Sequence, residues 1–201
     1  MNFLGVVREQ LQEAASLHRE VSAREEIVGL VSAWGKIAAD ALSRGGTVFF
    51  AGNGGSFADA QHMAAELTGK MGRPRKPLSA VVLGSNSSSL SAVGNDYGFD
   101  NVFARELEAL ACPNSVVIAF STSGKSGNIL ALAKSAEKIG IPMLTMTGDD
   151  GNEVGAFCET LKVPSLRTER IQEIHTLLGH TLCLVIEEEL GLCEGSYNNL
   201  S

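Results

Sequence analysis

The sequence lacks an excess of positive charge and lacks long apolar runs. Its formal net charge is −7, which argues against nucleic acid or an anionic membrane as the main partner, because phosphate-backbone binding needs a clustered basic surface. No segment approaches the roughly eighteen apolar residues of a membrane span, and the N-terminus has no basic segment followed by an apolar core. We therefore expect neither membrane insertion nor secretion.

Cysteine is also scarce, and no two cysteines have the two-residue spacing of a zinc knuckle or a redox motif. Cys112, Cys158, Cys183 and Cys193 are scattered along the chain, so we interpret them as reduced packing residues of a cytoplasmic protein. One segment, residues 70–76, is basic although the chain as a whole is acidic, and we interpret it as a solvated loop.

The hydrophobic content of 44% with only 5% aromatic residues fits an interior rich in Leu, Val and Ala, and 201 residues are enough for one well-buried domain. Apolar residues recur at helical spacing through residues 1–43, which predicts two helices before Gly45 and Gly46. Beyond them strands alternate with helices, which predicts a parallel sheet covered on both faces. The expected strands are 47–51, 79–83, 115–120, 141–147 and 159–163, and the expected helices are 56–69, 88–93, 101–110, 126–139 and 168–190. We expect a single α/β domain over residues 1–201, whose first 44 residues cover the sheet or mediate oligomerisation.

Two loops rich in small residues follow strand-like runs. Residues 120–128 (FSTSGKSGN) place hydroxyl groups and glycines between a strand and a helix, and residues 52–56 (GNGGS) follow the run 47–51. Hydroxyl donors, accessible backbone N–H groups and the positive end of a helix together can hold a phosphate dianion. Because ligands of parallel sheets bind beyond the carboxyl ends of the strands, we expect both loops to grip one phosphorylated ligand.

Neither loop fits a nucleotide motif. The segment Gly124-Lys125-Ser126 ends like a P-loop, but the glycine required five residues earlier is Ala119. The glycine loop resembles a dinucleotide fingerprint, yet its third glycine position is Phe57. The sequence thus supports neither ATP nor NAD.

Polar residues on two predicted helices could hold a metal. His62 and Glu66 are four residues apart and share a helix face, an arrangement that is either a metal site or a surface pair. Gln172, His175 and His180 flank the apolar stripe of the last helix, where a lone histidine is more often a core residue. Gln172 and His180 are separated by roughly 12 Å of helix rise, so they reach one ion only if their side chains lean together or a neighbouring subunit supplies one. Such ligands suit Zn²⁺ or another divalent ion.

The turn-like segment 94–98 (GNDYG) is either a tight turn or a place where Asn95 and Asp96 bind sugar hydroxyls. Asp59 precedes His62 by three residues, and it either orients that imidazole or charges the first turn of its helix.

These motifs, in this order over nearly the whole chain, closely resemble the phosphoheptose isomerase family of the sugar isomerase (SIS) superfamily. The resemblance rests on residues 52–56, 61–69, 94–99, 121–128, 144–148 and 170–175, together with His180. It implies a flavodoxin-like three-layer SIS fold with a five-stranded parallel sheet, a homotetramer with active sites at subunit interfaces, and one Zn²⁺ per subunit. It also implies interconversion of sedoheptulose 7-phosphate and D-glycero-D-manno-heptose 7-phosphate in bacterial heptose biosynthesis.

The resemblance also implies roles for individual residues. The implied metal ligands are His62, Glu66, Gln172 and His180, and the implied base and acid of an enediol mechanism are Glu66 and His180. The implied substrate-binding residues are Asn53, Gly54, Gly55, Ser56, Glu66, Asn95, Asp96, Ser121, Thr122, Ser123, Ser126 and Gln172. Lys70 stands where the family commonly has Arg, and Glu169 where it has Asp, which affects substrate detail more than reaction class. Two alternatives stay open: a non-catalytic regulator that binds a partner protein, and an isomerase of a related phosphosugar.

Overall fold

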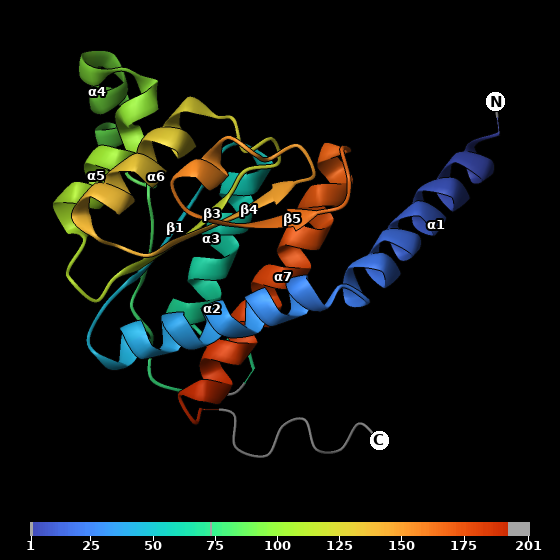
Figure 1. Cartoon of the computed structure of the whole chain (residues 1–201), viewed down its shortest axis with the longest axis horizontal. Helices are drawn as coiled ribbons and strands as arrows, with labels where there is room; N and C mark the ends of the chain where they lie inside the picture. The colour runs from blue at the N-terminus through green and yellow to red at the C-terminus, as the bar shows by residue number, and fades with distance from the viewer. Residues whose placement is uncertain (1, 73, 193–201) are drawn as a thin grey trace.

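A five-stranded parallel sheet forms the centre of the molecule (Figure 1). The computed structural model describes residues 2–72 and 74–192. The strands lie in the order β2-β1-β3-β4-β5, and their bounds are β1 (Val48–Gly52), β2 (Ala80–Val82), β3 (Val116–Phe120), β4 (Met143–Gly148) and β5 (Glu159–Val163). The three central strands β1, β3 and β4 are buried along their whole length, as expected for strands covered on both faces.

Helices cover both faces of the sheet. Their bounds are α1 (Phe3–Ser22), α2 (Glu25–Ser43), α3 (Gly55–Thr68), α4 (Ser87–Tyr97), α5 (Val102–Leu110), α6 (Gly127–Ile139) and α7 (Thr168–Glu189), with short 3-10 helices at Phe99–Asn101 and Val154–Ala156. Figure 1 shows α2, α3 and α7 on one side of the sheet and α5 and α6 on the other. The predicted α/β architecture and its five-stranded parallel sheet are confirmed.

The alternation of side chains along each strand divides the apolar interior into two clusters. Phe50 and Ile118 pack with α2, α3 and α7, whereas their chain neighbours Phe49 and Val117 pack with α5 and α6. Successive strand residues point to opposite faces, so each strand supplies both clusters. Full burial of one such side chain contributes about 1.5–3 kcal/mol.

Helix α1 differs from the others because its apolar residues are largely exposed. Phe3, Leu4 and Leu11 expose 71%, 81% and 66% of their surface, whereas Leu17 near its end is buried. Figure 1 shows α1 extending away from the sheet and its covering helices. The use of the first 44 residues for oligomerisation stays a prediction.

Two local predictions are wrong. Residues 94–97 do not form a tight turn but the last turn of α4, which runs to Tyr97 instead of ending near residue 93. The basic segment 70–76 is not uniformly solvated, because the side chain of Arg75 is only 3% exposed. Its guanidinium binds backbone carbonyls at the end of α3, which the sequence pattern does not reveal.

Cys112, Cys158 and Cys183 are free thiols, whereas Cys193 lies outside the described residues. Burial raises the pKa of Cys183 to about 12, so this thiol is a packing group.

Among the described helices, none combines the length and apolar character needed to cross a membrane.

Candidate active site

The two predicted loops meet at the point where the sheet changes its winding direction. Strands β1 and β3 are neighbours, and their last residues Gly52 and Phe120 are paired in register. After β1 the chain enters α3 on one face, and after β3 it enters α6 on the other. Adjacent strands whose following helices diverge leave a crevice at their carboxyl ends, where α/β proteins bind ligands.

A reciprocal pair of amide hydrogen bonds joins the two loops. Asn53 donates from Nδ2 to Oδ1 of Asn128 at 2.9 Å, and Asn128 donates from Nδ2 to Oδ1 of Asn53 at 2.8 Å. Asn128 is only 2% exposed, so solvent does not compete for these bonds. The pair fixes the distance between the glycine loop and the first turn of α6.

The serine loop is held in place by its own backbone. The N–H of Gly124 donates to Oγ of buried Ser121 at 3.2 Å, and the N–H of Lys125 donates to Oγ of Ser123 at 3.2 Å. Ser126 is the N-cap of α6. The loop therefore presents its hydroxyl groups from a fixed turn beside the start of a helix.

Three helices begin at one cavity between these loops. The cavity has a volume of about 180 Å³ and is lined by Asn53, Ser56, Phe120, Ser121, Thr122, Ser126, Thr168 and Gln172. Ser56 lies in the first turn of α3, Ser126 caps α6, and Thr168 begins α7.

The first turns of these helices leave backbone donors available. Within the described part of the chain, the N-caps of α3, α6 and α7 make no side-chain capping hydrogen bond. Helix N-termini carry unsatisfied N–H groups and partial positive charge, so their convergence defines an anion site.

The remaining residues of the predicted phosphate set lie at the margins of this cavity. Ser123 lines an adjoining cavity of about 160 Å³ together with Thr122, and Gly54 lines a third together with Asn53. Gly55 lies against Gln172: a Cβ atom at Gly55 would be 2.6 Å from the Nε2 atom of Gln172. A larger residue at this position would require the amide of Gln172 to move.

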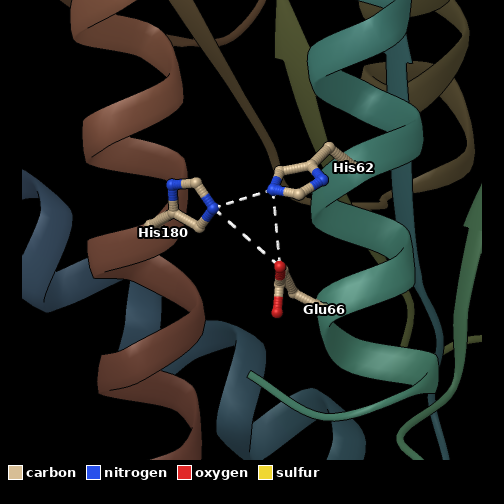
Figure 2. A group of neighbouring side chains, drawn as sticks. All are labelled: His62, Glu66 and His180. Carbon is tan, nitrogen blue, oxygen red and sulfur yellow. Dashed lines mark hydrogen bonds and ion pairs between the residues drawn. The ribbon is translucent and has the colours of Figure 1, made fainter. Parts of the chain in front are cut away.

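His62, Glu66 and His180 lie close together near the middle of α3 and α7 (Figure 2). The two Nε2 atoms of the histidines are 2.9 Å apart, and Oε1 of Glu66 lies 3.4 Å from Nε2 of His62 and 3.9 Å from that of His180. Ligand atoms around a tetrahedral ion with bonds of about 2.0–2.1 Å are roughly 3.4 Å apart. These residues thus form a possible metal site, and their donor atoms fit a divalent transition-metal ion.

Asp59 joins the two helices that carry this triad. Its Oδ1 accepts a hydrogen bond of 2.7 Å from Oγ1 of Thr176 on α7. Burial raises the pKa of the Asp59 carboxyl, while this hydrogen bond and the nearby His62 and His180 lower it. The hydrogen-bond partner of Asp59 is therefore Thr176 on α7. Its two predicted roles, orienting His62 or placing charge in the first turn of its helix, stay predictions.

The structure separates some of the predicted residues from the triad. Gln172 lies two turns before His180, and it lines the cavity at the helix N-termini, so its role as a metal ligand stays a prediction. Asn95 and Asp96 are exposed at the end of α4, where Nδ2 of Asn95 donates to Oδ1 of Asp96 at 2.7 Å. Their contact with a sugar also stays a prediction.

His175 is a core residue. Its ring lies 5.9 Å from that of Phe120, and its Nε2 lies 3.4 Å from the carbonyl oxygen of Thr147. Burial lowers the pKa of His175 to about 4, so the ring is neutral and donates this bond.

Sequence reasoning missed three residues of the site: Asn128, Thr168 and Thr176. Asn128 ends the serine-rich motif and could have been noticed there. Thr168 and Thr176 carry no sequence signal, because the spatial neighbours that make them part of the site belong to distant segments.

The fold is an α/β domain with an anion site where three helix N-termini converge, and the family model described as "SIS domain" matches residues 11–148, so the domain is of the SIS type. A phosphoheptose isomerase of Campylobacter jejuni is 43% identical over 187 residues, which cover 92% of this chain and 98% of that protein. Solved structures of phosphoheptose isomerases from Francisella tularensis and Neisseria gonorrhoeae are also similar. Their identities are 30% and 36%, their TM-scores 0.86 and 0.84, and they cover 94% and 93% of this chain and all of each solved chain. The chain belongs to the phosphoheptose isomerase family.

Proposed function

We propose that the protein interconverts sedoheptulose 7-phosphate and D-glycero-D-manno-heptose 7-phosphate through an enediol, as the first step of bacterial heptose biosynthesis. The observation that carries this proposal is the arrangement of two sites along one pair of helices. The anion cavity lies at the N-terminal ends of α3 and α7, and the histidine and glutamate triad lies farther along the same helices.

The anion cavity would hold the phosphate of the substrate. The hydroxyl groups that contact it would come from Ser56, Ser121, Thr122, Ser123 and Ser126. The glycine loop would contact the ligand from the other side through Asn53, Gly54 and Gly55. The phosphate is remote from the reacting carbons, so its binding energy serves to hold the chain in register with the triad.

The spacing of the two sites fits a sugar that carries its phosphate at the far end. From Ser56 to His62 the helix rises roughly 9 Å, and from Gln172 to His180 roughly 12 Å. A phosphate bound at the cavity therefore leaves the opposite end of a seven-carbon chain near the triad. We propose that the part of the sugar between the anion cavity and the triad contacts Gln172, Asn95 and Asp96.

Aldose–ketose isomerisation moves a proton between C1 and C2, so it needs a base and an acid beside those carbons. We assign Glu66 as the base and His180 as the acid, each with a contribution of about 10² to 10⁴. The side chain of Glu66 is only 18% exposed, so bulk water competes little for its carboxylate.

We further propose that His62, Glu66, Gln172 and His180 hold one Zn²⁺ per subunit. When bound, such an ion supplies Lewis-acid polarisation of the substrate carbonyl. Gln172 would reach the ion by reorienting its amide, or the ligand set would be completed across a subunit interface.

A homotetramer in the cytoplasm completes the proposal. The exposed apolar residues of α1, among them Phe3, Leu4 and Leu11, support burial of this helix against other copies, since contiguous apolar surface marks interaction sites.

Proton NMR of sedoheptulose 7-phosphate in D₂O tests the reaction directly. The purified protein with zinc is expected to produce an aldoheptose signal with deuterium at C2, and chelator is expected to suppress it. No turnover with zinc, in folded protein, would contradict the proposal and favour another phosphosugar or a non-catalytic regulator.

Glu66→Gln is the matched variant for this experiment. It keeps the shape of the side chain but cannot take a proton, so turnover should fall by about 10² or more while the phosphosugar still binds. Full activity of this variant would refute the assignment of the base.

A further inference from the structure

A buried ion pair lies beyond the triad, at the far end of the contact between α3 and α7. Nε of Arg75 donates to Oε1 of Glu187 at 2.5 Å, and both side chains are 3% exposed. Nη2 of Arg75 donates to the carbonyl oxygen of Glu66 at 2.7 Å, and Nη1 to that of Leu67 at 2.8 Å. The guanidinium therefore binds the last turn of α3 with one set of donors and α7 with another.

This pair connects directly to the residues of the triad. Glu66 is one of them, and its own backbone carbonyl accepts from Arg75. Glu187 follows His180 by seven residues, a spacing that places both on the same face of α7. One guanidinium thus fixes the turn that carries Glu66 relative to the helix face that carries His180.

Nearer the triad, α3 and α7 also meet through a close apolar contact and a hydrogen bond. At Gly179, next to His180, a Cβ atom would lie 2.6 Å from Sδ of Met63, and Thr176 donates to Asp59 nearer the N-terminus. Apolar helix surfaces tolerate small sliding movements, whereas the fork of a guanidinium has directional donors. The ion pair therefore supplies the directional contact at the end of this interface.

We propose that Arg75 and Glu187 are positioning residues that set the register of α3 against α7 and thereby hold His62, Glu66 and His180 at metal-binding distances. This inference rests on the metal site of the proposed function. It assigns a role to a segment whose sequence indicates only a basic loop.

The test separates positioning from general stability. Breaking a buried ion pair on one side leaves an unpaired charge and destabilises the fold, but replacing both partners by apolar residues of similar volume is often neutral or stabilising. The double variant Arg75→Met with Glu187→Leu should therefore fold without an unpaired buried charge, with a melting temperature somewhat below that of the parent because the carbonyls of Glu66 and Leu67 lose a donor. This variant lacks the ion pair by which Arg75 connects the end of α3 to Glu187 of α7.

Cobalt binding is the readout, because the absorption of Co²⁺ reports both affinity and coordination geometry. Metal-free parent and double variant, each as the full chain, are titrated with Co²⁺. We expect the double variant to bind about 10- to 100-fold more weakly, the usual effect of losing a group that orients metal ligands, with an altered visible spectrum. The control removes the exposed pair of Lys36 and Glu189, which joins α7 to α2, by glutamine at both positions, and it should bind Co²⁺ like the parent.

Each outcome decides one question. Parental affinity and spectrum in the folded double variant would overturn the positioning role while leaving the metal site intact. Failure of the parent itself to bind Co²⁺ would instead overturn the metal site of the proposed function. If the double variant does not fold, the same titration is made on Arg75→Lys, which keeps the charge but loses the fork that binds both helices at once, and parental binding there overturns the inference.

Discussion

Nε2 of His62 and Nε2 of His180 lie 2.9 Å apart, although 118 positions separate the two residues in the sequence. Their rings meet at 82°. The two ring nitrogens are within hydrogen-bond distance of each other, and the carboxylate of Glu66 lies beside both.

The first prediction concerns metal and stability. A metal that binds only the folded chain should raise the free energy of unfolding by about 2.7 kcal/mol at one hundred times its dissociation constant. Differential scanning calorimetry with zinc and with chelator should show this shift in the parent. His62→Ala should lose the shift, and an unchanged response to zinc in that variant would place the metal elsewhere.

Asn128→Ala should weaken the binding of a phosphorylated substrate. The substitution removes two hydrogen bonds between the loops, each with a net value of about 0.5–1.5 kcal/mol, so we expect the KM for the phosphosugar to rise about tenfold, with a smaller change in kcat. Inhibition by inorganic phosphate should weaken in parallel. Asn114→Ala, which removes one exposed bond to the carbonyl of Arg44, is the control, and equal effects in both variants would contradict a specific role.

His175 should make stability depend on pH. Above pH 6.5 the ring is neutral in the folded and the unfolded chain, so it contributes no pH dependence there. As the pH falls from 6.5 to about 4, the unfolded chain binds a proton that the folded chain does not accept.

The free energy of unfolding should therefore decrease over that window, by about 3 kcal/mol at its lower end. Urea unfolding of the parent and of His175→Gln between pH 4 and 7 isolates this contribution. The variant should have a shallower pH dependence, and identical slopes would show that His175 is not the group responsible.

Gly179→Ala should destabilise the protein by crowding the interface between α3 and α7. The added methyl group would lie 2.6 Å from Sδ of Met63, and overpacking of this kind costs about 1–3 kcal/mol. At Gly29 of α2 an added Cβ meets nothing within 4 Å, so Gly29→Ala should instead stabilise by about 0.5–1 kcal/mol. Thermal unfolding compares the two, and loss of stability of the same size in both would reject the packing explanation.

Much of the fold was predictable because local patterns determine it. The apolar runs before Gly52 and before Ser121 are strands in the structure, and the loops after them form one cavity as predicted. The burial of Arg75 was not predictable, because its partner Glu187 lies 112 positions away. Residues 94–97 contain turn-forming types, yet the helix that begins at Ser87 continues to Tyr97 and ends only before Gly98.

The site was predictable in its composition and less so in its geometry. His62 and Glu66 share a helix face by spacing alone, but their meeting with His180 depends on how α3 and α7 pack. Gln172 was grouped with the same ligands, and in the structure it lines the anion cavity. Helical spacing gives the rise between two residues but not the direction in which each side chain leans.

The convergence of three helix N-termini has a consequence for how this protein can change during evolution. The donors of the anion cavity include main-chain N–H groups of three helix N-termini beside the hydroxyl side chains, and the main-chain groups persist whichever side chain is present. A single substitution can therefore weaken the grip on phosphate but does not abolish it. Recognition of the sugar depends on side chains, so descendants of this chain can acquire new sugars while they remain bound to phosphorylated ones.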